Sequence, residues 1–173
     1  PQFHYRGTFD GQEHTITLAM TNTTTEPYGL FQYTEPGCII RNLKVSGKID
    51  TNSTYFGSIV SDATGTTIER CISDATLKGQ ANIGGLIGIS RGKCFLENCA
   101  YIGSIEGGAT ASALVGKNSQ KISIKSCYSA PDVSGSSAST VNAFTDKISK
   151  VETNLNNHYL GNLSTANQEG EAS

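Results

Sequence analysis

The fold is decided by residues 82–107, which read Asn-Ile-Gly-Gly-Leu-Ile-Gly-Ile-Ser-Arg-Gly-Lys-Cys-Phe-Leu-Glu-Asn-Cys-Ala-Tyr-Ile-Gly-Ser-Ile-Glu-Gly. The same pattern recurs on both sides of this stretch at a period of about 28 residues, within the range typical of repeat architectures. Equivalent positions form columns of similar residues: Gly29, Gly57, Gly85 and Ala113; Phe31, Ile59, Ile87 and Val115; Ile40, Ile68, Leu96 and Ile124; Ile49, Leu77, Ile105 and Val133; Leu43, Cys71, Cys99, Cys127 and Leu155; Gly79, Gly107 and Gly135. Agreement in so many columns at one fixed period identifies a repeat protein.

Each copy has the local pattern of β-strands. In the central copy, apolar Cys94 and Leu96 alternate with Phe95 and Glu97, which is the period of a strand. Asn98 interrupts the alternation and predicts a bend, because Asn tolerates left-handed backbone. Its column contains Asn42, Arg70, Asn98, Ser126 and Asn154. Each copy is expected to hold three short strands, at residues 83–88, 93–97 and 99–105 in the central one.

A copy of this length is too short to bury its own apolar face, so it must stack on its neighbours. Stacking at one strand spacing predicts an all-β fold, a parallel β-helix (β-solenoid) of about five coils. The crossover rule for parallel strands favours a right-handed coil. A β-propeller needs about 40 residues per blade, and the pattern of a leucine-rich repeat is absent.

The pattern sets the expected organisation of the chain. Residues 1–160 form a single β-helix domain, with 1–27 as an irregular N-terminal coil or cap and 28–135 as regular coils. Residues 136–160 form a degenerate last coil or cap, because the copy near 141–144 has lost its glycines and gained about two residues. Residues 161–173 are expected to be a loosely ordered polar tail without core residues.

Composition excludes two classes of partner. The 173 residues carry a formal net charge of -2, which gives no reason to expect nucleic acid as a partner. No run of apolar residues is long enough for membrane insertion, and no signal-peptide pattern opens the chain. Because the chain begins at Pro1, we expect a mature product or an excised piece whose own targeting signal is missing.

Two segments resemble a known family. The opening segment Gly7-Thr8-Phe9-Asp10-Gly11-Gln12-Glu13-His14-Thr15-Ile16 is similar to that of bacterial GLUG-repeat proteins. Gly84-Gly85-Leu86-Ile87-Gly88 followed by Leu96-Glu97-Asn98-Cys99 resembles their repeat unit. The resemblance implies a parallel β-helix in large secreted or surface-attached proteins, including adhesin-like proteins and immunoglobulin-A-cleaving metalloproteases. The metal site of those proteases lies in a separate domain, so no site residue transfers to this chain.

Three of the five cysteines fall in one column: Cys71, Cys99 and Cys127. Coils about 4.8 Å apart would allow a disulfide between neighbours. Three thiols cannot all pair, however, so the pattern favours a buried ladder of free thiols and leaves one bridge as the alternative. Cys38 and Cys94 lie two coils apart, too far to bridge. No His falls near the column, and no metal site or cofactor is expected.

Charged residues form two further columns on the outside of the predicted coil. The first contains Arg41, Glu69, Glu97 and Lys125, and the second Asp50, Lys78 and Glu106. Stacked carboxylates are typical of glycosidases, but the basic neighbours in both columns favour a solvated ladder. His4, His14 and His158 lie at the two ends of the chain, and no spacing singles out a Ser-His-Asp triad. We therefore expect no catalytic residues.

Phe95 is the one candidate binding residue, because its column points outward, whereas Tyr28 and Phe56 are expected to pack inside. The sequence as a whole predicts a non-catalytic structural, adhesin-like binding or spacer module of a larger secreted or surface-exposed bacterial protein. Its expected partners are a host protein, a glycan or other domains of the parent. The alternatives are a carbohydrate-active β-helix, such as a polysaccharide lyase or hydrolase, and an accessory domain of a secreted protease.

Overall fold

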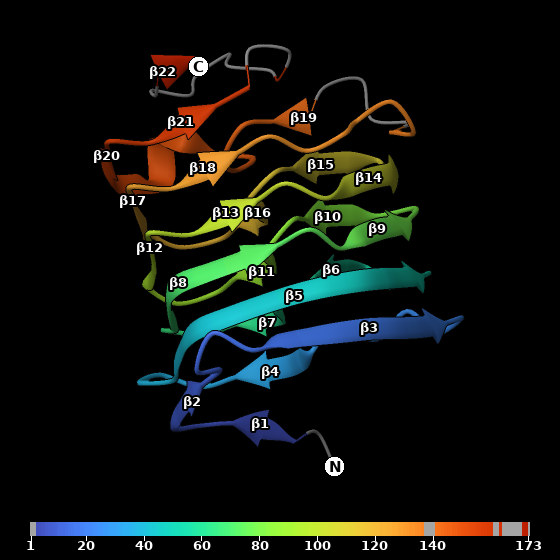
Figure 1. Cartoon of the computed structure of the whole chain (residues 1–173), viewed down its shortest axis with the longest axis horizontal. Coiled ribbons are helices and arrows are strands. Elements are labelled where there is room, and N and C mark those ends of the chain that lie inside the picture. The colour runs from blue at the N-terminus through green and yellow to red at the C-terminus, as the bar shows by residue number, and fades with distance from the viewer. Residues whose placement is uncertain (1–2, 137–140, 161–162, 164–170, 173) are drawn as a thin grey trace.

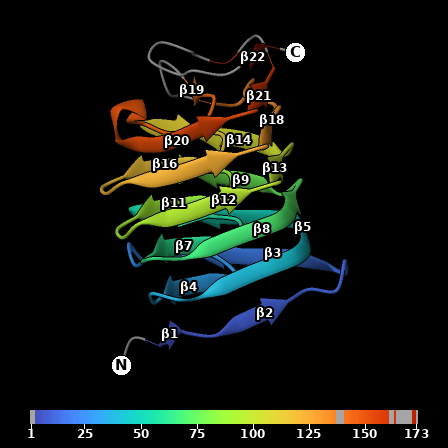
Figure 2. The same cartoon turned by 90° about the vertical axis from the view of Figure 1, so that its left-hand side faces the viewer.

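The computed structural model describes residues 3–136, 141–160, 163 and 171–172, and within them the chain forms a parallel β-solenoid. The coils stack along one axis, with the N-terminal coil at one end and the C-terminal coil at the other (Figure 1, Figure 2). Every strand pairing is parallel, and the strands belong to three sheets. The predicted fold class is therefore confirmed.

The first sheet contains β1 (His4–Tyr5), β4 (Phe31–Thr34), β7 (Val60–Ala63), β11 (Ile87–Ser90) and β16 (Val115–Asn118). The second contains β19 (Val141–Asn142), β15 (Thr110–Ser112), β10 (Asn82–Gly84) and β6 (Tyr55–Gly57). The large third sheet contains β2 (Thr8–Asp10), β3 (Thr15–Asn22), β5 (Ile39–Thr51), β8 (Thr67–Ser73), β9 (Thr76–Gly79), β12 (Cys94–Glu97), β13 (Ala100–Tyr101), β14 (Ser104–Gly107), β17 (Ile122–Lys125), β18 (Tyr128–Ser129), β20 (Val151–Leu155), β21 (His158–Tyr159) and β22 (Glu171–Ala172). A 3-10 turn, η1 (Ile148–Lys150), precedes β20.

The core consists of equivalent residues stacked coil on coil. Ile40 pairs with Ile68, Ile68 with Leu96, and Leu96 with Ile124, and all four are at most 1% exposed. This column confirms the predicted period. Each buried Ile or Leu contributes about 1.5–3 kcal/mol to folding, and each finds its partners in the neighbouring coils.

The three strands expected in the central coil are subdivided. The region 83–88 becomes β10 and β11, separated by Gly85 and Leu86, and the region 99–105 becomes β13 and β14, separated by Ile102 and Gly103. The region 93–97 corresponds to β12. The chain passes from the second sheet to the first at Gly85 and Leu86, whereas β12, β13 and β14 all belong to the third sheet, so one coil contributes strands to all three sheets.

A column of left-handed residues forms one corner of the coil. Asn42, Arg70, Asn98 and Ser126 have φ angles of 51°, 52°, 53° and 50°. The bend predicted at this column is confirmed. The fifth member is Asn156, at φ 53°, and the prediction of Asn154 was wrong.

The wrong prediction has a physical cause in the length of the last coil. Ala111 pairs with Val141 and Lys125 with Leu155, so equivalent residues here lie 30 apart, the two extra residues that the sequence indicated. Leu155 therefore stands outside the cysteine column and is 53% exposed. Buried Asn157 takes its place, with its side-chain oxygen accepting a 2.8 Å hydrogen bond from the Cys127 N–H.

A second correction concerns the column of Phe31 and Ile87. Val60, not the predicted Ile59, pairs with both, and Gly57 pairs with Gly84 instead of Gly85. The turn at 52–54 has one residue more than its counterpart at 80–81, and the turn at 91–94 has one more than its counterpart at 64–66. The two insertions cancel, which is why the period looked constant.

The two ends also differ in part from expectation. Residues 4–22 form a first coil, because β1 pairs with β4 while β2 and β3 pair with β5. At the other end Leu163 is 5% exposed and packs into the core, and β22 pairs with β21. Residues 161–173 therefore contain a core residue, which corrects the expectation that they contain none. The predicted loose order of the tail otherwise lies outside the described residues.

The left-handed corner predicts an unusual cost for a surface substitution. Asn98 is exposed, so replacing it by Val removes no core contact. We expect Asn98→Val to lower the free energy of unfolding by about 1–2 kcal/mol, because a β-branched residue resists positive φ. Asn98→Gly should change it by less than about 0.5 kcal/mol. Urea unfolding measures both.

Glu97→Val provides the matched control, because Glu97 is exposed one residue earlier in the extended strand β12. Equal destabilisation by Glu97→Val and Asn98→Val would contradict the backbone explanation.

Candidate functional site

The predicted column of Asp50, Lys78 and Glu106 lies in a groove on the outer face of the large sheet. Asp50 pairs with Lys78 and Lys78 with Glu106, at the ends of the stacked strands β5, β9 and β14 (Figure 1). A bridge from Ser104 to Asp132 extends the same face by one coil. The groove encloses about 390 Å³. It is also lined by Asn52, Gln80 and Ser134.

A column of glycines lies beside the charged column. Gly79, Gly107 and Gly135 all line the groove. A Cβ atom on Gly79 would lie 2.6 Å from the Phe56 ring, so this position cannot hold a side chain. The sequence predicted the column, and the structure shows that close packing against the buried Phe56 ring requires glycine at position 79.

Charges of both signs face the groove. The Asp50 Oδ2 atom lies 3.6 Å from the Lys48 ammonium and 3.7 Å from the Lys78 ammonium. These pairs are exposed and contribute little to stability. The Ser134 N–H donates a 2.9 Å hydrogen bond to Asp132, which lowers the pKa of that carboxyl group. The groove therefore offers carboxylate acceptors next to an ammonium donor.

Phe95 lies where the sequence placed it, on the outer face of β12. Its side chain is 40% exposed, and the Lys93 ammonium lies 5.6 Å from the ring centroid. A cation–π contact at an exposed site contributes about 0.5–1 kcal/mol. Lys93 also forms an ion pair with Glu152 of β20. Phe95 does not line the groove, so the structure does not bring this candidate together with Lys78.

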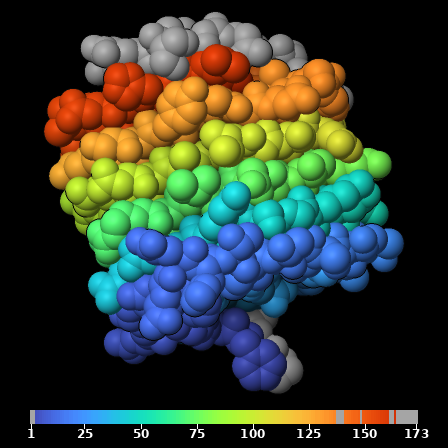
Figure 3. All heavy atoms as spheres, viewed as in Figure 1, coloured from blue at the N-terminus to red at the C-terminus, as the bar shows by residue number. Residues whose placement is uncertain are grey.

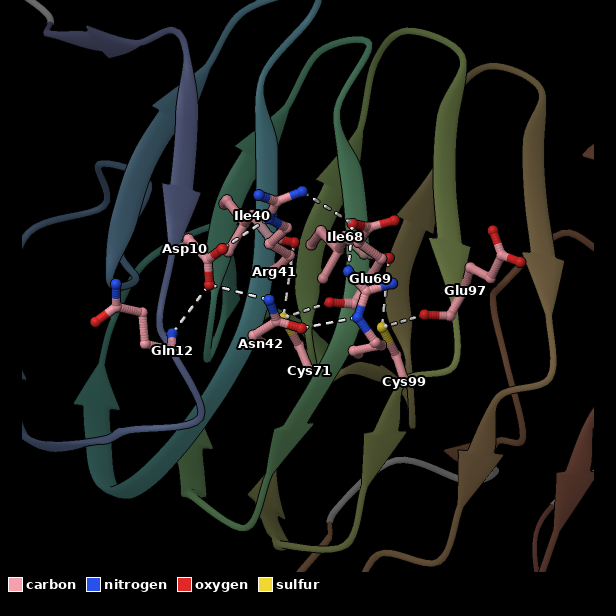
Figure 4. Close-up of polar contacts among 11 residues, drawn as sticks. Asp10, Gln12, Ile40, Arg41, Asn42, Ile68, Glu69, Cys71, Glu97 and Cys99 are labelled. Carbon is pink, nitrogen blue, oxygen red and sulfur yellow. Dashed lines mark hydrogen bonds and ion pairs between the residues drawn. The ribbon is translucent and has the colours of Figure 1, made fainter.

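In the other predicted charged column, Arg41 and Glu69 take part in a ladder of side-chain contacts (Figure 4). Arg41 lies between Asp10 at 2.9 Å and Glu69 at 3.9 Å, and Glu69 also pairs with Arg70 at 2.8 Å. Hydrogen bonds from Asn42, from the Gln12 N–H and from Arg41 lower the pKa of Asp10. The ladder is consistent with the predicted solvated arrangement, and Asp10 and Arg70 extend it beyond the expected residues.

The cysteine column is a buried ladder of thiols. All five cysteines are free and buried, so the expected ladder is confirmed and the alternative of a bridge is not present. The three stacked thiols each donate to the carbonyl oxygen two residues earlier: Cys71 to Glu69 at 3.3 Å, Cys99 to Glu97 at 3.2 Å and Cys127 to Lys125 at 3.2 Å. Figure 4 shows the first two of these contacts.

Burial makes the central thiol a poor nucleophile. Burial raises the pKa of Cys99 well above the usual value of a thiol. Hydrogen bonds with Cys99 lower the pKa of Cys71 and of Cys127 below that usual value. Burial also raises the pKa of Cys38 to about 11. Since the thiolate is the reactive form and solvent does not reach these residues, the column packs as small apolar side chains.

Sequence reasoning missed an exposed apolar strip on the strands β8, β13, β18 and β21. Ile72 and Tyr128 both flank Ala100 in one column, and they are 43% and 37% exposed. Ile102 and Leu160 belong to the outward-facing column two residues further along the coil, and they are 47% and 40% exposed. The repeat could have indicated this strip, because positions 72, 100 and 128 are equivalent. These positions hold Ile, Ala and Tyr, however, so the column has no common residue type. Sequence reasoning also missed that Asp132 joins the groove.

The histidines are not assembled into a site. His4 stacks on Tyr33 with ring centroids 5.0 Å apart, at the N-terminal end, whereas His158 lies in β21 at the opposite end. Among residues 3–136, 141–160, 163 and 171–172, no cluster of three or more His, Cys, Asp or Glu has a geometry that could hold a metal ion. The same residues include no helix long and apolar enough to cross a membrane.

Comparison of the chain with protein-family models, with curated proteins and with solved structures finds no match. The resemblance to GLUG repeats therefore stays a prediction based on the quoted segments.

The buried ladder predicts a two-part result in thiol titration. The native protein should react slowly with a colorimetric disulfide reagent, because all five thiols are buried. In denaturant without reductant, five thiols per chain should react at once. A count of three would mean that two cysteines are bridged and would contradict the free ladder.

Proposed function

We propose that this chain is a non-catalytic, adhesin-like binding and spacer module of a larger secreted or surface-exposed bacterial protein, and that its groove contacts a glycan. The observation that carries the proposal is the groove itself, in which Asp50, Lys78 and Glu106 stand one above another on successive coils. The quoted likeness to GLUG repeats supports the bacterial surface setting.

The rod supports the spacer role. The core cluster extends from Leu18 in the first coil to Leu163 beyond the last, with each coil packed on the next. In such a stack the coils contact only their neighbours, so length is added coil by coil without changing the cross-section. A module of this kind holds a fixed distance between whatever lies at its two ends.

The chemistry of the groove favours a hydroxyl-rich ligand. Carboxylates accept hydrogen bonds from hydroxyl groups, and an ammonium group donates to their oxygens. The side chains repeat at one coil step, ~4.8 Å, which is about the length of one pyranose unit. A glycan chain lying along the coil axis would therefore meet one charged side chain at each sugar, in the order Asp50, Lys78 and Glu106.

Binding should depend on the groove. On a glycan array, Lys78→Ala and Glu106→Gln should each weaken binding about fivefold or more, since a hydrogen bond to a charged group contributes ~1.5–3 kcal/mol. Lys125→Ala is the matched control, because it removes a lysine from the other charged column. Equal binding by all three variants would rule out the groove as the contact site.

The carbohydrate-active alternative rests on one observation, that the groove holds three carboxylates. Asp50, Glu106 and Asp132 all line it, and pairs of carboxylates are the usual catalytic groups for cleaving glycosidic bonds. We expect no cleavage, because Asp50 is held between two lysines.

Incubation with a panel of acidic and neutral polysaccharides, followed by analysis of chain length, tests this expectation. Release of oligosaccharides that disappears in Glu106→Gln or in Asp132→Asn would establish the enzymatic function instead.

A further inference from the structure

The N-terminal end of the solenoid exposes the edge of β3. All eight residues of this strand pair with β5, which in turn pairs with β8 and β9 on its other side. Within the described part of the chain, no strand pairs with the second edge of β3. Figure 3 shows this coil as the lower end of the molecule.

The hydrogen-bonding groups at the open edge can be assigned. The His14 carbonyl accepts from the Lys44 N–H, and the Asn22 carbonyl accepts from the Asn52 N–H, so even-numbered residues face β5. Because backbone groups alternate along a strand, the odd-numbered residues direct their N–H and C=O groups to the open edge. These are Thr15, Thr17, Ala19 and Thr21.

The edge lacks the usual protection against pairing. Exposed edge strands normally carry charges, prolines or bulges, whereas β3 reads Thr-Ile-Thr-Leu-Ala-Met-Thr-Asn. The core also remains open at this end. Residues packed on it stay only partly buried: Tyr5, Phe9, Ile16, Met20 and Phe31. Phe3, which directly precedes β1, is 83% exposed.

We propose that two copies of this chain associate head to head, with β3 pairing antiparallel to β3 of the second copy about a two-fold axis at Leu18. Most homo-oligomers use such a symmetric interface, in which one surface must be complementary to itself. The strand meets this condition. From residue 15 to residue 21 its exposed and inward positions read the same in both directions about Leu18.

The register follows from the direction of the side chains. Residues directly opposite each other in an antiparallel pair point to the same face, so the inward residues of one copy must oppose inward residues of the other. Centring on Leu18 places Ile16 opposite Met20 of the partner subunit, on the core side. Thr17 then faces Ala19 of the partner subunit on the outside.

This pairing satisfies the open edge. Thr15, Thr17, Ala19 and Thr21 become the facing pairs that exchange two hydrogen bonds each, about eight in total. The Thr21 carbonyl already accepts a 3.4 Å hydrogen bond from the Tyr28 hydroxyl and would accept the second with its other lone pair. No like charges oppose each other within the strand, because it contains no charged residue. The partly buried aromatic residues of the two end coils are brought together, which covers the open core.

The test uses the 173-residue chain in analytical ultracentrifugation. The wild type should sediment with twice the 18.3 kDa mass of one chain at micromolar concentration. The double variant Thr17→Glu/Ala19→Glu sets glutamates opposite each other at both facing pairs, and should raise the dimer dissociation constant about fivefold or more. Thr17→Lys/Ala19→Glu sets lysine opposite glutamate and should keep it within about threefold of wild type.

The two variants share Glu at position 19, beside Lys48 of the same chain, and differ only at position 17. Circular dichroism checks that both stay folded. A wild type that stays monomeric up to about 100 μM, even if it captures a strand from another protein, would overturn the proposal. So would equal dissociation constants for the two variants.

Discussion

Parallel, in-register stacking is the constraint on which the rest of this structure depends. Because every strand lies directly above its equivalent, the main neighbours of each side chain are the equivalent side chains in the coils above and below it. The residues of one column must therefore be able to pack against one another. Ile40, Ile68 and Leu96 satisfy this inside, where identical apolar groups pack well. Outside, like charges are a cost, and Glu97 above Glu69 is the one such pair in its ladder.

The structure offsets that cost locally. Arg41 and Arg70 both contact Glu69, the first from the coil below and the second from the adjacent position in the same coil. Arg70 can do so because its left-handed backbone turns the side chain back toward the ladder, where it also donates to Asn42. The corner thus has two roles, since it bends the coil and supplies a cation to the charged column.

Most of the architecture could be predicted from the period, because a column of Ile and Leu residues states directly which residues stack. The one-residue offsets at the corners of the coils could not be predicted. The extra residues at 52–54 and 91–94 cancel, so columns beyond them stay aligned and conceal the shift that places Val60 where Ile59 was expected. The two extra residues of the last coil were visible, but not which column they displaced. The place of Asp132 in the groove could not be predicted either, because its own column holds Ser and Thr in the neighbouring coils.

The cancelling offsets have a consequence for how such a molecule can change over generations. An added residue at a corner is absorbed within one turn of the chain, while the walls above and below keep their pairing. An insertion therefore changes one corner of one coil and leaves the strand pairing of the neighbouring coils as it was. Corners such as 52–54 and 91–94 are where natural variation in length should accumulate, and where a new surface loop could arise without refolding the rod.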